Sequence, residues 1–188
     1  MIITYIRSSS YTCHELCPMK WFIEYNLGWR GPSGIKAEKG TVVHKVLEIL
    51  AIIKLKQQQG KTYFTDDIVG RIYVNKYDLD KIIDKCTDFY EKHSVHKWKP
   101  IDRKHCHKWV YKAIEYDNGL YDPRNNIIVQ PEQSFDIVID KPWSKYEYTL
   151  PDGKVISGNL SIKGTIDQIS QIDDDTYQIL DWKGLPGS

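Results

Sequence analysis

Apolar residues recur with two different periods along the chain, a helical period in the first half and an alternating one in the second. Between residues 37 and 57 they recur every three or four positions and form one broad face, which predicts the longest helix. A second amphipathic stretch predicts a helix from Asp78 to about Lys92. The segment 8–27 has a polar start and an interruption at Cys17-Pro18, so it predicts two short helices that end near Gly28.

Short apolar runs with strand-like composition fill the second half of the chain. The stretches 127–130 and 135–139 predict two strands with Pro131 between them. Residues 146–157 contain a Pro-Asp-Gly turn and predict a hairpin, and residues 162–182 predict another around three consecutive aspartates. Helices followed by mostly antiparallel strands indicate an α+β fold, an α/β sandwich in which helices flank a mixed central sheet.

The last of these hairpins carries the most distinctive chemistry. Pairing of its strands brings Asp167 close to Asp181, and the alternation of side chains places Asp181 and Lys183 on one face. Two carboxylates and an ammonium at one spot are costly unless a ligand balances their charge. Mg²⁺ or Mn²⁺ suits these hard oxygen ligands, and the lysine can orient or activate a water molecule. The alternative is that these are ordinary solvated charges at strand ends.

The composition fits one globular domain. At 188 residues and 22.0 kDa the chain is long enough for a sizeable core, so residues 1–188 are expected to form a single domain. The net charge of +1 means that any affinity for nucleic acid must come from local patches. No apolar run approaches the ~18 residues of a membrane span, and the N-terminus lacks a signal-peptide pattern. An intracellular protein without a membrane partner follows, so its four cysteines are expected as thiols or ligands.

Residues 92–112 differ from the rest in charge. They contain seven Lys and Arg against one acid, Asp102, with aromatic residues interleaved. Positive charge with aromatic faces suits a phosphate backbone with exposed bases, whereas a solvated surface anchored by tryptophan is the equally good alternative. The candidate nucleic-acid-binding residues are Lys97, Trp98, Lys99, Arg103, Lys104 and Lys108.

Four short motifs occur in order between residues 11 and 183. They are Tyr11-x5-Cys17-Pro18-x3-Phe22-x2-Tyr25, then Gly40-x3-His44 with Glu48 following, then Gly164-x-Ile166-Asp167, and finally Ile179-Leu180-Asp181-Trp182-Lys183. In this order they resemble the PD-(D/E)XK nuclease superfamily, in its RecB-like exonuclease branch. Glu132 resembles a further acid that members carry on the strand before the first metal-binding aspartate. A lone histidine on an apolar helix is usually a packing residue, but this resemblance makes His44 a candidate for function.

The resemblance implies a restriction-endonuclease-like core that hydrolyses phosphodiester bonds in DNA with Mg²⁺ or Mn²⁺. His44, Asp167, Asp181 and the carbonyl of Trp182 would bind the metal, and Lys183 would position or deprotonate the attacking water. Glu48 and Glu132 are possible additional acids. The implied setting is DNA recombination, repair or phage DNA processing, in the cytoplasm of a bacterium or of a phage-infected cell. DNA is then the partner, with a helicase or another recombination protein as a further one.

Two features depart from the family pattern. Members usually continue past Asp-x-Lys with Thr-Gly and a helix that closes over the site, whereas this chain ends five residues after Lys183. We therefore expect either a natural minimal form or a fragment. Some relatives hold an iron–sulfur cluster with one N-terminal and three C-terminal cysteines, and only Cys17 matches that arrangement. A differently wired four-thiolate cluster is conceivable, but we favour structural thiols. The cysteines concerned are Cys13, Cys17, Cys86 and Cys106.

Three function classes therefore compete. The leading hypothesis is a metal-dependent DNA exonuclease. A site-specific or structure-specific endonuclease of the same superfamily is second, although no recognition module is visible. The third is a nucleic-acid-binding or structural domain of a helicase–nuclease assembly with an incomplete active site, which the missing closing helix favours.

Overall fold

The computed structural model describes residues 3–182, and these divide into two compact units that each consist of two chain segments. Among the described residues, the first unit comprises 3–31 and 134–165, and the second comprises 32–133 and 166–182. The predicted single domain over residues 1–188 stays a prediction. Within the described residues, no helix combines the length and the apolar character of a membrane span.

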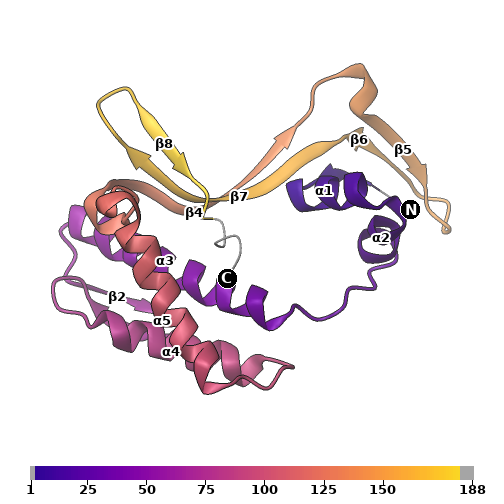
Figure 1. Cartoon of the computed structure of the whole chain (residues 1–188). Coiled ribbons are helices and arrows are strands. Elements are labelled where there is room, and N and C mark those ends of the chain that lie inside the picture. The colour runs from indigo at the N-terminus through magenta and orange to yellow at the C-terminus, as the bar shows by residue number, and fades with distance from the viewer. Residues whose placement is uncertain (1–2, 183–188) are drawn as a thin grey trace. The chain divides into compact units, whose positions relative to one another are not determined.

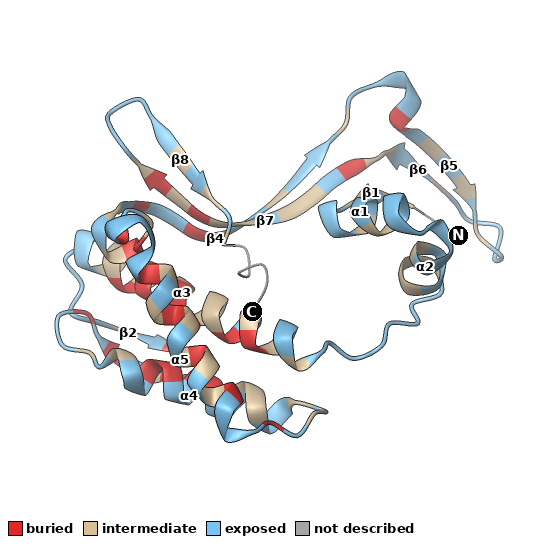
Figure 2. Cartoon of the chain, in the orientation of Figure 1, coloured by how far each residue is buried: buried red, intermediate tan, exposed pale blue. Residues whose placement is uncertain are grey.

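Three helices form the body of the second unit (Figure 1). They are α3 (Ile35–Gln58), α4 (Leu79–His93) and α5 (Pro100–Glu115). The fully buried residues gather where these helices face one another (Figure 2), with Val46, Leu50, Ile83 and Val110 all at 0 % exposure. A hairpin of β2 (Tyr63–Asp66) and β3 (Gly70–Tyr73) packs against this core. The helix predicted over residues 37–57 and the one from Asp78 are both confirmed.

Helix α5 lies in the basic segment, where the sequence pattern predicts no helix. It begins with Pro100 at its first position, and the carboxylate of Asp102 accepts the backbone N–H of Lys99 at 2.9 Å. Such a cap satisfies a helix-end donor that would otherwise lack a partner. Cys106, Val110 and Ile114 form its buried stripe. Charged, aromatic and histidine side chains surround this narrow stripe, which conceals the helical period.

Four strands form a mixed sheet, which confirms the predicted α+β class. They are β1 (Tyr5–Ile6), β4 (Ile127–Val138), β7 (Ser161–Gln171) and β8 (Tyr177–Leu180). Strand β7 pairs with β4, runs parallel to β1 and is antiparallel to β8. The β7–β8 register opposes Gln168 to Leu180 and Gln171 to Tyr177, so the final hairpin is confirmed.

Strand β4 differs from the prediction of two strands separated at Pro131. It is one continuous strand, and Glu132 adopts a positive φ of 49° within it. A local backbone distortion therefore absorbs the proline without ending the strand. The side-chain amide of Gln58 on α3 both donates to the carbonyl of Ile128 and accepts its N–H, each at 2.8 Å. This double contact fixes the start of β4 beside α3.

The first unit contains the N-terminal helices and a separate hairpin. Helices α1 (Ser8–Leu16) and α2 (Pro18–Trp21) are followed by one π-helical turn, η1 (Phe22–Asn26). Cys17 separates them, and its sulfur accepts the Lys20 N–H, so the predicted break is confirmed. Strands β5 (Lys145–Thr149) and β6 (Val155–Asn159) form the hairpin predicted around the Pro-Asp-Gly turn. Short 3₁₀ turns complete the chain: η2 (Tyr116–Gly119), η3 (Pro123–Asn125) and η4 (Pro142–Ser144).

A buried ion pair joins α3 to α5. The ammonium of Lys39 lies 2.9 Å from Asp102 Oδ1 and 3.1 Å from His105 Nδ1. Both charged side chains are almost fully buried. Because each charge has lost its hydration, each depends on the other for compensation.

We predict that Lys39→Met lowers the free energy of unfolding by about 3 kcal/mol, because it leaves the Asp102 carboxylate buried without its cation. The double variant Lys39→Met/Asp102→Leu should recover most of this loss, with about 1 kcal/mol still missing for the lost helix cap. Urea unfolding followed by circular dichroism measures both. A double variant that is less stable than the single one would contradict the buried-pair interpretation.

Candidate functional site

The centre of the site lies where α3 meets the end of the final hairpin. His44 Nδ1 is 3.6 Å from Asp167 Oδ2, and the backbone N–H of Trp182 donates to the same oxygen at 2.7 Å. The rings of His44 and Trp182 meet edge to face, with their centroids 6.1 Å apart. Helix α3, strand β7 and the second residue after β8 thus converge on one carboxylate.

The hairpin register adds a second carboxylate. Extending the observed pairs by one residue opposes Asp167 to Asp181, and the two side chains contact each other. The backbone of Trp182 also makes a hydrogen bond to His44. The predicted proximity of Asp167 and Asp181 is therefore confirmed, and His44 and Trp182 lie beside them. That these four residues bind a metal stays a prediction.

Glu132 joins this group from β4. Its side chain is half-buried, and it borders the same open cleft of about 910 Å³ as His44, Glu48 and Asp167. A positive φ is unusual for a residue with a Cβ atom, and such strain often re-aims a side chain at a functional site. We infer that the left-handed backbone at Glu132 turns its carboxylate toward the cleft.

A neighbouring ion-pair network contains two residues that sequence analysis missed, Lys45 and Asp66. The ammonium of Lys45 lies 3.0 Å from Asp66 Oδ2 and 3.1 Å from Glu48 Oε2. Asp66 also accepts the N–H groups of Ile68 and Val69 at 2.9 Å each. The three-residue spacing of Lys45 and Glu48 was visible in the sequence, but nothing there linked Asp66 to this helix. Glu48 therefore already has a cation beside it.

The pKa shifts of the site residues reflect the negative charge in the cleft. Burial alone would raise the pKa of Asp167, but hydrogen bonds from His44 and from the Trp182 N–H outweigh burial and lower it. The Asp167 carboxylate in turn raises the pKa of His44, against the opposing effect of burial. Burial, followed by the charges of Asp167 and Glu48, raises the pKa of Glu132. A cation in the cleft would stabilise the ionised form of Glu132 beside these charges.

The comparison with protein families agrees with this geometry. The family model described as the PD-(D/E)XK nuclease superfamily matches residues 8–187. The chain belongs to this superfamily. Neither curated proteins nor solved structures give a significant match. Lys183, which completes the Asp-x-Lys motif of the superfamily, lies outside the described residues.

The donor set suits the metal that this superfamily typically uses. Asp167, Asp181 and Glu132 supply hard carboxylate oxygens, and the burial and nearby negative charges that raise the pKa of Glu132 would favour a divalent cation. Within residues 3–182, however, no three His, Cys, Asp or Glu side chains already stand in a metal-binding arrangement. One oxygen of Asp167 instead accepts a hydrogen bond from the Trp182 N–H. The donors fit Mg²⁺ or Mn²⁺ chemically, and a bound ion would supply Lewis acidity and lower the pKa of water.

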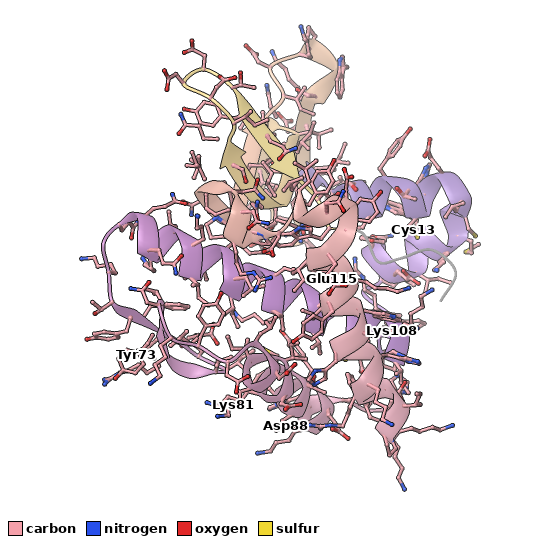
Figure 3. The ribbon with its side chains drawn as sticks, turned by 60° about the vertical axis from the view of Figure 1, so that its left-hand side comes forward. Cys13, Tyr73, Lys81, Asp88, Lys108 and Glu115 are labelled. Carbon is pink, nitrogen blue, oxygen red and sulfur yellow. The ribbon has the colours of Figure 1, made fainter. Side chains whose placement is uncertain are left out.

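The predicted nucleic-acid-binding residues fall into different environments, and one prediction is wrong. Trp98 is only 6 % exposed, packs in the core and donates its indole N–H to Glu38 at 2.9 Å, so it cannot stack on a base. Arg103 already pairs with Asp88 and Glu91 on α4. The exposed lysines, among which Lys108 projects from α5 (Figure 3), stay predictions: Lys97, Lys99, Lys104 and Lys108.

The four cysteines are divided between the two units. Cys86 and Cys106 are completely buried in the helical core of the second unit, as expected for small core residues. Cys13 lies in α1 and Cys17 lies between α1 and α2, both in the first unit. None of the four takes part in a group of three or more potential metal ligands among the described residues. The structure therefore gives no support to a four-thiolate cluster.

We predict that two thiols react with a disulfide reagent in the native protein and that four react after denaturation. Burial raises the pKa of Cys86 to about 12 and that of Cys106 to about 11, so neither forms thiolate at neutral pH. Cys17 is exposed and Cys13 is half-buried, so these two should react. Mass spectrometry of the labelled peptides measures this pattern. Labelling of Cys86 as fast as Cys17 would contradict the burial described here.

Proposed function

We propose that the chain is a Mg²⁺- or Mn²⁺-dependent exonuclease of the RecB-like branch, which hydrolyses phosphodiester bonds in DNA during recombination, repair or phage DNA processing. The observation that carries this proposal is the convergence of His44, Asp167 and Asp181 at the end of one hairpin. They come from three separate sequence motifs, one on helix α3, one on β7 and one directly after β8. A packing role for His44 would not require its contact with a half-buried carboxylate.

The side chains have distinct roles in this proposal. Asp167, Asp181 and His44 hold the metal, together with the Trp182 carbonyl, and Glu132 adds a further acid. Lys183 orients the attacking water and offsets the charge that develops on the phosphate. Lys45 lies between Glu48 and Asp66. These two carboxylates hold the Lys45 ammonium beside the cleft, and this ammonium limits the net negative charge of the cleft. An anionic backbone can then approach these carboxylates at lower electrostatic cost.

An exonuclease is preferred over a site-specific endonuclease because no element among residues 3–182 is recognisable as a module that reads base sequence. The exposed lysines of the basic segment supply contacts that depend only on phosphate. A helicase or another recombination protein is the proposed partner, since such enzymes supply unwound strands.

A specific observation favours a second candidate, a nucleic-acid-binding or structural domain with an incomplete site. The described residues contain no ready group of three metal ligands. Metal binding and cleavage therefore need separate tests.

We predict that the chain degrades linear DNA and leaves closed circles intact when Mn²⁺ is present. Asp167→Asn and Lys183→Ala should each reduce the rate at least about a hundredfold, because each removes a charged group at the reacting centre. Asp174→Asn is the matched control, since it makes the same Asp-to-Asn change at the exposed turn of the same hairpin. Gel analysis of end-labelled substrates measures the rates. Cleavage of circles would favour the endonuclease, and equal rates for Asp167→Asn and Asp174→Asn would refute the proposed site.

We predict that Mn²⁺ raises the thermal midpoint of the wild-type chain by about 5–10 °C at a hundredfold excess over its dissociation constant. Asp167→Asn should lose this shift, whereas Asp174→Asn should keep it. Differential scanning calorimetry measures the midpoints. A shift without cleavage would identify a metal-binding domain with an incomplete site, whereas equal shifts in both variants would place the metal elsewhere.

A further inference from the structure

A second hollow lies in the second unit next to the candidate site. Its volume is about 310 Å³, within the range of small-ligand pockets. His44 and Asp181 belong to its wall, so it opens directly beside the carboxylates. Four of the residues that line it are aromatic: Trp109, Tyr116, Tyr121 and Trp182. Lys112 is the cation in this wall.

Trp109 is held firmly before any ligand arrives. Its ring stacks on His105, with the two planes 4° apart and their centroids 5.9 Å apart. The Lys39 ammonium lies 5.0 Å from the Trp109 ring centre, and Asp102 fixes that ammonium in turn. A ring constrained on this side presents its remaining surface to the hollow without losing rotational freedom on binding.

The two tyrosines are held by a strained turn. Tyr116 and Tyr121 stack with centroids 5.9 Å apart, across a segment in which Asp117, Asn118 and Gly119 all have positive φ. The side chain of Asn125 donates to the Gly119 carbonyl at 2.9 Å and pins this turn. Positive φ at Asp117 and Asn118 costs free energy and persists only where the surrounding structure enforces it. Tyr116 nevertheless remains 62 % exposed, so the turn presents a large aromatic surface to solvent.

The chemistry of this wall matches a nucleobase. Aromatic faces bind any base by stacking, and this wall is largely apolar. The ammonium of Lys112 can pair with a neighbouring phosphate. We infer that the hollow binds one unstacked base of the strand whose phosphodiester lies at His44 and Asp167. This inference rests on the proposed function.

A consequence for the substrate class follows. A base inside a duplex is stacked on both faces and cannot enter a separate pocket without unpairing. The strand in the site is therefore single-stranded, either along its length or at a frayed end. Paired DNA has to be opened before it can be bound in this way.

The test uses single-stranded oligonucleotides that carry 2-aminopurine at successive positions, titrated with the full chain in EDTA so that no cleavage is needed. Stacking in the hollow should quench the fluorescence at one position more than at the others. Tyr116→Leu and Tyr121→Leu should each weaken binding roughly tenfold, because each removes a stacking face. Tyr73→Leu is the control, since Tyr73 is similarly exposed but lies on the β2–β3 hairpin (Figure 3).

A change in the DNA alone tests the same contact without any risk that a protein variant folds poorly. An abasic site at the quenched position should weaken binding to wild type roughly tenfold, and should cause almost no further loss with Tyr116→Leu. The inference is overturned if no position is preferentially quenched, or if both tyrosine variants bind like Tyr73→Leu. It is also overturned if the abasic site weakens binding to Tyr116→Leu as much as it weakens binding to wild type, because the base and Tyr116 would then act independently.

Cleavage in Mn²⁺ separates this inference from the proposed function. If the abasic site and Tyr116→Leu show non-additive losses of binding but wild type cuts no DNA, the nuclease proposal fails and the base-binding hollow stands. If wild type cuts linear DNA but shows no such coupling, the hollow is rejected and the nuclease proposal stands.

Discussion

The carboxylate of Asp167 is the point on which the second unit's chemistry depends. One of its oxygens receives the backbone N–H of Trp182 and faces the ring of His44, so a single group ties a strand, the chain after the next strand and a helix together. The hydrogen bonds keep the group ionised despite its partial burial. A register shift of one residue between β7 and β8 would reverse the face of every side chain on β8 and separate Asp181 from Asp167.

Helix α3 places His44 beside this carboxylate because the helix contributes to two surfaces at once. One face carries the apolar residues that fill the core, among them Val46 and Leu50, which are completely buried. His44, Lys45 and Glu48 lie on the face that borders the cleft. Burial of the first face fixes the rotation of the helix, and that rotation positions the second face. The double hydrogen bond between Gln58 and Ile128 then holds β4, and with it Glu132, against the same helix.

Sequence patterns predicted the parts of this arrangement that depend on local periodicity and on hairpin register. The long helix and the approach of Asp167 to Asp181 both follow from spacing alone. Three features could not be predicted, each for a physical reason. The buried stripe of α5 is narrow and surrounded by charge, the distortion at Glu132 depends on its tertiary surroundings, and the Lys45–Asp66 pair joins elements that no motif connects. Trp98 was misjudged because a basic sequence context says nothing about which side of a segment faces the core.

Trp182 connects the carboxylate cleft to the aromatic hollow. Its backbone N–H bonds to Asp167, while its indole meets His44 and lines the hollow. Because one residue serves both places, any movement that reorients the Trp182 backbone also moves the aromatic wall. A base seated against that wall would therefore favour one position of the Asp167 carboxylate, and a group bound at Asp167 would favour one shape of the hollow. Such coupling is reciprocal by thermodynamic necessity, so occupation of either place must strengthen or weaken occupation of the other by the same factor.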